Sequence, residues 1–233
     1  MSESLPAVLI PGLLDSARLY AAQIPELWCC GPVMIANHTC DGSMAAIARR
    51  ILASAPPRFA LAGLSMGGYI SFEILRQAPA RVAKLALLDT SARADTPEAT
   101  AMRRTQMALA SDGRLGEVVE VQFERMVHPL RRNDPQLREI NRLMAEETGP
   151  EAFIRQQTAI IGRPDSRPAL AAISCPTLVL VGEQDELTPP DRAVEMAHGI
   201  RGARLVTVPE CGHLSTLERP REVTRALLDW LRG

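Results

Sequence analysis

Aromatic side chains are scarce in this sequence of 233 residues: four Phe, two Trp and two Tyr make up 3% of it. Proteins that bind single-stranded nucleic acid stack bases on aromatic side chains, and proteins that bind duplexes concentrate positive charge on one surface. The formal net charge here is −1, and the pI is about 6.4. The composition therefore argues against nucleic acid and against an anionic membrane surface as partners.

Long apolar runs are missing as well. No stretch reaches the roughly 18 residues that a membrane-spanning helix requires, and residues 1–6 contain neither the positive nor the apolar segment of a secretory signal peptide. The five cysteines form no Cys-x-x-Cys pair and have no accompanying histidine at metal-site spacing. We therefore expect a cytoplasmic protein with reduced thiols at Cys29, Cys30, Cys40, Cys175 and Cys211.

Six short runs predict β-strands, and four of them are almost continuously apolar, as in a sheet covered on both faces. Helix-like patterns lie between them at residues 43–54, 68–77 and 190–198, and another closes the chain at residues 220–232. Ser43 is a suitable N-cap, and Pro220 suits a first helical turn. This alternation predicts an α/β fold with a doubly wound, mostly parallel sheet. The predicted strands are residues 7–10, 33–36, 59–62, 84–88, 177–181 and 204–208.

The alternation stops between residues 92 and 171, where no strand-like run occurs. Four helices are predicted there, and two of them begin with a capping residue and a proline, at Thr96-Pro97 and Asp134-Pro135. Ligands of open α/β sheets bind at the carboxyl edge of the strands, which such an insertion would cover. We therefore expect a core domain of residues 1–91 and 172–233 and a helical cap, or lid, of residues 92–171.

Glycines flank a serine in Gly63-Leu64-Ser65-Met66-Gly67, between a predicted strand and a predicted helix. A serine on such a sharp turn projects its Oγ above the sheet, and the glycines are needed where the two backbones pass too close for a Cβ. The helix that follows directs unpaired N–H groups at the same place. This pattern predicts a nucleophilic serine at Ser65.

A serine nucleophile needs a base, and the base needs a carboxylate that orients it. Of four histidines, His213 is the one in a loop directly after a predicted strand and before a helix, and we interpret it as the base. His38, His128 and His198 are interpreted as structural or peripheral. Asp185 follows the strand at residues 177–181 and is the favoured carboxylate.

Asp89 is the alternative to Asp185, because it ends the strand at residues 84–88. The order Ser65, Asp185, His213 is the one that nucleophile-elbow hydrolases use.

An oxyanion hole needs two N–H donors. We expect one from Met66, directly after the nucleophile, and one from Leu13, with Leu14 as the alternative.

On these motifs the chain resembles the α/β-hydrolase superfamily along nearly its whole length. In style it is similar to small bacterial esterases and to enol-lactonase-like enzymes with a helical cap. It departs from the family in having Pro11-Gly12 where His-Gly is frequent. A further departure is that the family's first antiparallel hairpin is missing, so a sheet of about six strands is expected. The resemblance rests on Pro11-Gly12-Leu13, Gly63-Leu64-Ser65-Met66-Gly67-Gly68, Gly182-Glu183-Gln184-Asp185 and Gly212-His213.

These residues predict a serine hydrolase that cleaves a small carboxylic ester or lactone through an acyl-enzyme, as a monomer or homodimer. No metal or organic cofactor is expected, since the triad supplies nucleophile, base and electrostatics. A C–C bond hydrolase, an acyltransferase and a non-catalytic ligand-binding protein are the alternatives. The lid is expected to determine which substrate is bound, but its sequence indicates the identity of that substrate less clearly. Its methionines (Met102, Met107, Met126, Met144) suit either a pocket or packing, and its arginines (Arg103, Arg104, Arg131, Arg132) suit either a substrate carboxylate or solvent.

Overall fold

A parallel β-sheet of six strands forms the centre of the molecule in the computed structural model, which describes residues 4–233. Its spatial order is β2-β1-β3-β4-β5-β6, and all five strand pairings are parallel. The predicted α/β fold class and the number of strands are confirmed. The strands are β1 (Ala7–Ile10), β2 (Val33–Ile35), β3 (Phe59–Leu64), β4 (Val82–Leu88), β5 (Thr177–Gly182) and β6 (Arg204–Val208).

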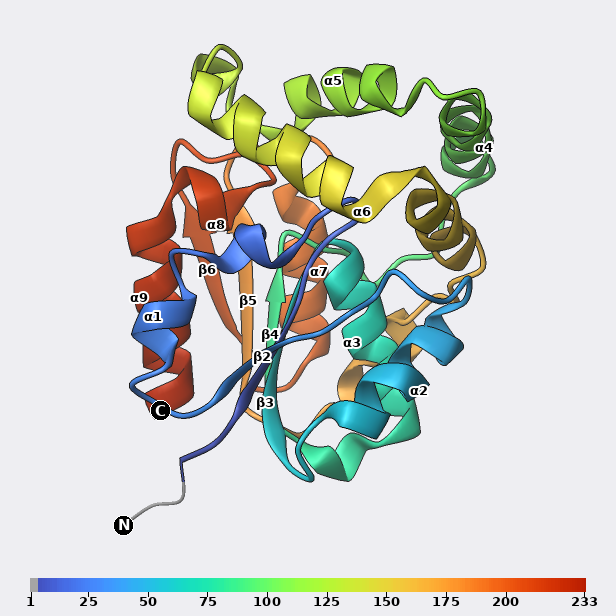
Figure 1. Cartoon of the computed structure of the whole chain (residues 1–233). Coiled ribbons are helices and arrows are strands. Elements are labelled where there is room, and N and C mark those ends of the chain that lie inside the picture. Colours follow the sequence, from blue (N-terminus) through green and yellow to red (C-terminus); the bar gives the residue numbers. More distant parts are fainter. Residues whose placement is uncertain (1–3) are drawn as a thin grey trace.

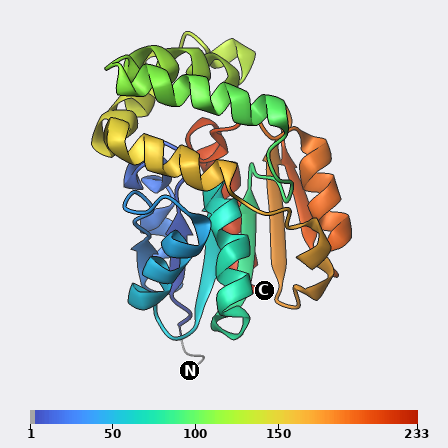
Figure 2. The same cartoon turned by 90° about the vertical axis from the view of Figure 1, so that its right-hand side faces the viewer.

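Both faces of the sheet are buried, because helices cover each of them (Figures 1 and 2). In β1, Val8 and Ile10 belong to the core on one face, while Ala7 and Leu9 belong to the core on the other. This follows from the period of two in a strand. Helices α2 (Met44–Ser54), α3 (Met66–Gln77) and α7 (Pro190–Gly199) pack on the first face, and α1 (Ile24–Leu27) and α9 (Pro220–Arg232) pack on the second.

Capping residues and prolines mark where several helices begin. The Ser43 hydroxyl accepts a hydrogen bond from the Ala46 N–H and begins α2, and Pro220 begins α9. Helix α3 starts at Met66, directly after Ser65, two residues earlier than the sequence predicts. The short elements were not predicted, because one turn is too short to show a helical period. They are η1 (Ala17–Tyr20), α1, η2 (Pro79–Arg81), η3 (Pro129–Arg131), η4 (Arg167–Ala172) and α8 (Ser215–Glu218).

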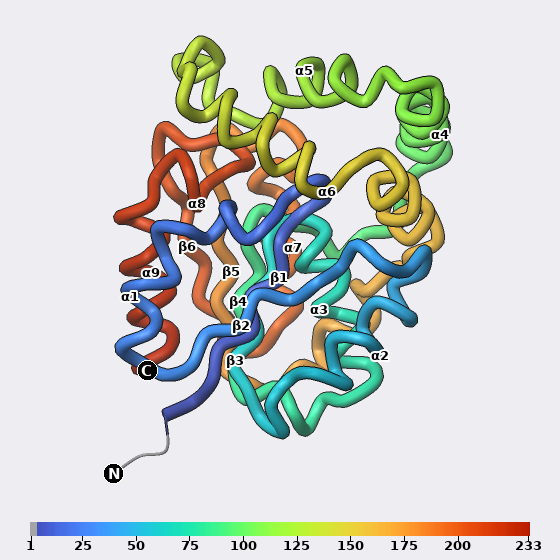
Figure 3. The backbone as a smooth tube through the Cα atoms, in the orientation of Figure 1, coloured from blue at the N-terminus to red at the C-terminus, as the bar shows by residue number. Residues whose placement is uncertain are grey.

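Three long helices between β4 and β5 lie across one end of the sheet (Figures 1 and 3). They are α4 (Pro97–Ser111), α5 (Leu115–Met126) and α6 (Pro135–Ile161). The expected third and fourth helices are joined in α6, which kinks at Gly149 (φ 77°), just before Pro150. Only glycine adopts this backbone angle at little cost. The limits proposed for the lid, residues 92 and 171, stay a prediction.

Apolar contacts anchor the lid to the core. Phe123 and Met126 of α5 pack into the core on the α9 side of the sheet. A separate apolar cluster inside the lid includes Phe153 and takes in Leu14, from the loop after β1. Each fully buried side chain of this size contributes about 1.5–3 kcal/mol. Within residues 4–233, none of the helices combines the length and the apolar character needed to span a membrane.

Candidate active site

The turn after β3 holds Ser65 in a strained backbone conformation, with φ 53° and ψ −114°. Its N–H donates to the Leu88 carbonyl at 2.9 Å, and its carbonyl accepts from the Thr90 hydroxyl at 2.7 Å. A non-glycine residue in such a region costs on the order of 1–3 kcal/mol, so neighbouring contacts must hold it. The strain supports a functional role for Ser65.

Glycines make this turn sterically possible. A Cβ on Gly63 would lie 2.2 Å from the Gly67 carbonyl oxygen, and a Cβ on Gly67 would lie 2.1 Å from the Ile10 carbonyl oxygen. No real Cβ approaches a backbone oxygen so closely. The close approach of strand and helix that the sequence predicts is therefore present.

Strained residues gather at the carboxyl edge of the sheet. Within residues 4–233, four non-glycine residues have positive φ: Leu14, Ser65, Asp89 and Glu210. They follow β1, β3, β4 and β6 respectively. Such residues cluster at functional sites, where the surrounding structure holds them in place. This edge is also where ligands of open α/β sheets bind.

His213 and Asp185 form a buried pair at this edge. The two are joined by a hydrogen bond of 2.8 Å between His213 Nδ1 and Asp185 Oδ2. Burial alone would lower the His213 pKa, but the charge and hydrogen bond of Asp185, aided by Asp89 and Asp15, raise it to about 9. Burial would likewise raise the Asp185 pKa, but His213 and Thr188 lower it. Asp185 is therefore ionised and favours the imidazolium form of His213.

The loop after β5 orients Asp185 through a set of donors. Its Oδ1 accepts from the N–H groups of Leu187 (2.8 Å) and Thr188 (2.9 Å), and its Oδ2 accepts from the Thr188 hydroxyl (2.7 Å). The competing carboxyl, Asp89, instead contacts the Ser215 hydroxyl and accepts from the Gly182 N–H at 2.8 Å. The carboxyl that contacts the imidazole is therefore Asp185.

A second set of contacts fixes the backbone around His213. The His213 N–H donates to the Met126 carbonyl of the lid at 2.7 Å. The Glu218 carboxyl accepts from the N–H groups of Gly212 (2.9 Å) and His128 (2.7 Å). Glu218 thus joins the imidazole loop to the lid. Sequence reasoning missed this residue, since nothing local distinguishes it from other helix-terminal glutamates.

A cavity of about 490 Å³ lies between the carboxyl edge of the sheet and the lid. Ser65 and His213 both line it. Within residues 4–233, no hydrogen bond of 3.5 Å or less joins Ser65 Oγ to the imidazole; such catalytic hydrogen bonds are often long until substrate binds. We call Leu13, Asp15, Ser65, Thr188 and His213 the cavity floor, and Ala99, Met102, Arg103, Gln106, Val121 and Arg125 the cavity roof.

The loop after β1 approaches the floor next to Ser65. Leu14 N–H donates to the Gln156 side chain of the lid at 3.2 Å. By contrast, neither the Leu13 nor the Met66 N–H has a protein acceptor among the described residues. Of the two expected alternatives, the Leu13 N–H is thus the one left available to a ligand.

His38 holds this loop in place. It is buried, and its Nε2 lies 2.7 Å from the Gly12 carbonyl oxygen. Burial lowers the His38 pKa to about 4, so the ring is neutral at pH 7 and Nε2–H is the donor. His38 is thus a structural residue, as its position before the serine suggested.

Asp15 is a buried carboxyl on the floor that sequence reasoning missed. A Cβ on Gly12 would lie 2.5 Å from Asp15 Oδ2 and 3.3 Å from Ser65 Cβ, so the carboxyl and the serine are separated by little more than Gly12. Burial raises the Asp15 pKa to about 7, against the charge of His213 and the Gly12 backbone, which lower it. No motif pointed to it, because Asp is frequent in loops.

In the described part of the chain, no group of three or more His, Cys, Asp and Glu side chains is arranged to hold a metal ion.

The lid methionines occupy different environments. Met102 and Met126 line the cavity, whereas Met144 is fully buried in the core. The lid arginines also divide: Arg103 lines the cavity, while Arg131 and Arg132 pair with Asp134 and Glu186.

Known proteins share this architecture. A thermophilic esterase from Thermogutta terrifontis, solved with malate bound, superposes with a TM-score of 0.89 and 34% identity, over 98% of this chain and 89% of that chain. An enol-lactonase from Burkholderia xenovorans superposes with a TM-score of 0.87 at 23% identity, over 100% and 93% of the two chains, and shows the fold alone.

Sequence comparison agrees with the superpositions. A pimeloyl-[acyl-carrier protein] methyl ester esterase of Nitrosomonas europaea is 26% identical over 175 residues, which cover 72% of this chain and 69% of that protein. The family model described as "Alpha/beta hydrolase family" matches residues 7–226. That match spans the strands, the elbow serine, the lid and the imidazole loop, and the chain therefore belongs to the α/β-hydrolase family.

Proposed function

We propose that this protein is a serine hydrolase that cleaves a small carboxylic ester or lactone through an acyl-enzyme formed on Ser65. One observation carries the proposal: a strained elbow serine faces the same cavity as an imidazole that is hydrogen-bonded to a buried carboxylate. This is the arrangement of nucleophile, base and orienting acid that acyl transfer requires.

The proposed steps follow from these groups. His213 Nε2 accepts the Ser65 hydroxyl proton while Oγ attacks the carbonyl carbon, and Asp185 stabilises the imidazolium that forms. The N–H groups of Met66 and Leu13 stabilise the oxyanion. The imidazolium then gives its proton to the departing alcohol, leaving an acyl-Ser65. Water attacks that ester with His213 as base, and the carboxylic acid departs as Ser65 regains its proton.

The relatives support ester chemistry. The Nitrosomonas europaea relative is named as a methyl ester esterase and the Thermogutta terrifontis protein as an esterase. Some family members with matching segments are named as hydrolases of oxo-dienoates, so C–C bond cleavage by the same triad is the second candidate. The cavity volume of about 490 Å³ fits a small substrate in either case.

Steady-state kinetics with an activated short-chain ester, 4-nitrophenyl butyrate, test the proposal. Replacing Ser65 with Ala removes the nucleophile, so kcat should fall about 10⁴-fold or more. His213→Ala should cost about as much, and the double variant little more than either single one, because the two act as a unit. Thr105→Ala, on the outer side of α4, is the matched control and should leave kcat unchanged.

A panel of esters, lactones and vinylogous diketones then separates the two candidates. Ester or lactone turnover that depends on Ser65, with none on the diketones, supports the proposal. Turnover of the diketones alone would replace it with the C–C hydrolase. Undiminished ester turnover in Ser65→Ala would refute a role for the serine.

A further inference from the structure

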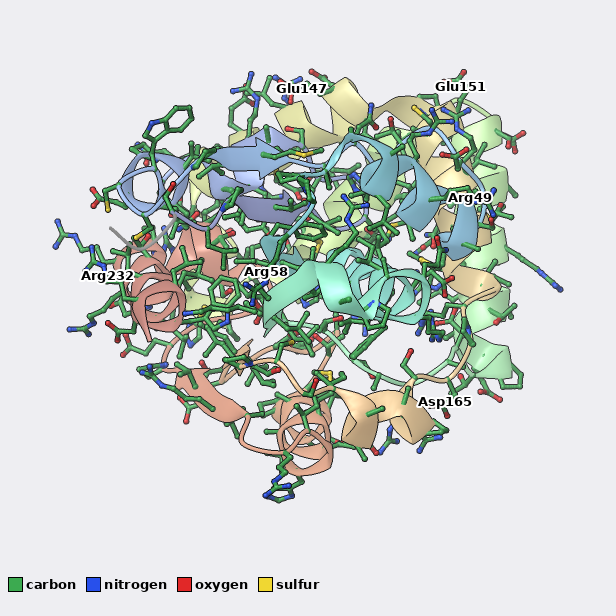
Figure 4. All side chains as sticks on the ribbon, turned by 90° about the horizontal axis from the view of Figure 1, so that it is seen from below. Arg49, Arg58, Glu147, Glu151, Asp165 and Arg232 are labelled. Carbon is green, nitrogen blue, oxygen red and sulfur yellow. The ribbon has the colours of Figure 1, made fainter. Side chains whose placement is uncertain are left out.

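The cavity carries far more positive charge than the molecule as a whole. The chain has 26 Lys and Arg against 27 Asp and Glu. The lining of the cavity has five arginines against two aspartates, Asp15 and Asp95, a formal excess of three positive charges. Outside the cavity both signs are spread over the surface, as Arg49, Arg232, Glu147 and Glu151 illustrate (Figure 4). The lining arginines are Arg93, Arg103, Arg125, Arg163 and Arg192.

Three of these arginines pair with carboxylates that are themselves mostly buried. Arg103 and Arg163 share the buried Asp95 carboxylate, at 2.7 and 2.5 Å. Arg93 makes two hydrogen bonds of 3.0 Å to Glu195, just behind the lining. These contacts fix the three guanidinium groups and offset much of their charge.

The remaining two arginines keep their charge available. Arg125, near the end of α5, has no carboxylate oxygen within 4.0 Å among residues 4–233. Arg192, in α7, is paired with the adjacent Asp191 alone, at 3.1 Å. The Asp191 side chain is 62% exposed, and an ion pair so open to solvent is weak. Both guanidinium groups therefore face the cavity with most of their charge uncompensated.

A buried carboxyl lies at the end of the cavity that holds Ser65. Asp15 is on the floor, close to Ser65 across Gly12. The positive charge of the His213 imidazolium there is offset by Asp185 and Asp15, whereas that of Arg125 and Arg192 is not, so a negative group on a ligand is attracted to the arginines. Arginine suits this role because its planar fork of donors matches a carboxylate.

We propose that the substrate is an ester that carries a free carboxylate, which Arg125 and Arg192 bind while the scissile carbonyl lies at Ser65. This inference rests on the proposed hydrolase function and narrows its substrate class. Because the arginines contact a remote part of the substrate, their contribution should be seen mainly in KM. It should also weaken with added salt, since Arg125 is exposed and the Arg192 side chain is 29% exposed.

A pair of matched esters tests the proposal by titration of released acid. Monoethyl succinate and ethyl butyrate differ by a carboxylate in place of a methyl group. The wild-type kcat/KM should favour monoethyl succinate at least tenfold at low ionic strength, and 0.5 M NaCl should reduce this preference. Arg125→Gln and Arg192→Gln should each reduce the preference at least fivefold, mainly by raising KM for monoethyl succinate.

Arg104→Gln is the matched control, because Arg104 lies beside Arg103 on α4 but is exposed and outside the lining. It should keep the wild-type preference. As a second measurement, free succinate should inhibit ethyl butyrate hydrolysis competitively, and less in the Arg125 and Arg192 variants. A wild-type preference near one, or equal losses with both esters, would overturn the carboxylate proposal while ethyl butyrate turnover left the hydrolase function standing. Loss of turnover with every ester would refute the hydrolase function itself.

Discussion

The floor and the roof of the cavity are built differently. On the floor, Ser65 and the Asp185 carboxyl that holds His213 from behind are fixed by backbone contacts within a few residues of a strand end. On the roof, Met102 is 42% exposed and Val121 is 67% exposed, and both lie on helices of the lid, α4 and α5. Precise geometry is needed where bonds change, whereas a binding surface tolerates variation. The comparison suggests that the floor sets the reaction and the roof selects the substrate.

Two buried carboxyls on the floor side of the molecule test this comparison most strongly. Asp185→Asn removes the charge that holds the His213 tautomer, so kcat should fall about 10³- to 10⁴-fold. Asp89→Asn should cost at most about tenfold, because the Asp89 carboxyl contacts the Ser215 hydroxyl and the Gly182 N–H rather than the imidazole. Steady-state kinetics with a neutral ester measure both. Equal losses would mean that the imidazole does not depend on Asp185.

The pH dependence of activity tests the electrostatics of the floor. His213 can act as a base only when neutral, and its pKa is raised to about 9, so kcat/KM for a neutral ester should rise with pH up to about that value. The Asp89 and Asp15 charges contribute to that rise along with Asp185. Asp15→Asn removes one of them and should move the rising limb to lower pH. A rising limb at the same pH in Asp15→Asn would show that the Asp15 charge does not contribute to the His213 pKa.

Asp15 should also reduce stability at neutral and alkaline pH. Its pKa is raised from 3.8 to about 7, so stability is fully present below pH 3.8 and is lost as the pH rises through 7. Asp15→Asn cannot ionise, and it should be more stable than wild type at pH 8 by about 1–4 kcal/mol. The two proteins should converge near pH 4. Urea unfolding at both values measures the difference, and a less stable variant at pH 8 would contradict the argument.

The smallest expected effects are on protein stability and come from replacing glycines in the lid. Gly149→Ala places a Cβ at φ 77°, where α6 kinks, and should destabilise by about 1 kcal/mol. Gly116→Ala, in α5, meets open space at an ordinary helical angle and should stabilise by about 0.5–1 kcal/mol. Thermal unfolding of both variants checks for these opposite signs. The same sign in both would mean that the kink does not require glycine.

The floor was easier to predict from sequence than the roof. Ser65 lies in a glycine pattern that sterics impose, and Asp185 and His213 each follow a strand that its apolar run reveals. Leu13 was chosen by its place after β1, and the hydrogen bond from Leu14 to Gln156, 142 residues away, became visible only in three dimensions. Such long-range contacts leave no local pattern.

The roof arginines show the same limit more strongly. The lid sequence suggested Arg103, Arg104, Arg131 and Arg132, but only Arg103 of these lines the cavity. A guanidinium on a helix faces solvent or cavity according to how that helix packs, and periodicity does not reveal the packing partner. The core boundaries were predicted more closely: β1 and β6 have the predicted limits, and β3 and β4 are each two residues longer than predicted.

Covalent labelling of Ser65 tests the central claim most directly. A fluorophosphonate that reacts only with an activated serine should add one adduct mass to the intact protein, and peptide mapping should place it on the segment that contains Ser65. The His213→Ala variant should react far more slowly, and Ser65→Ala should remain unlabelled. An adduct on another serine, or labelling of the wild type no faster than that of His213→Ala, would contradict the account.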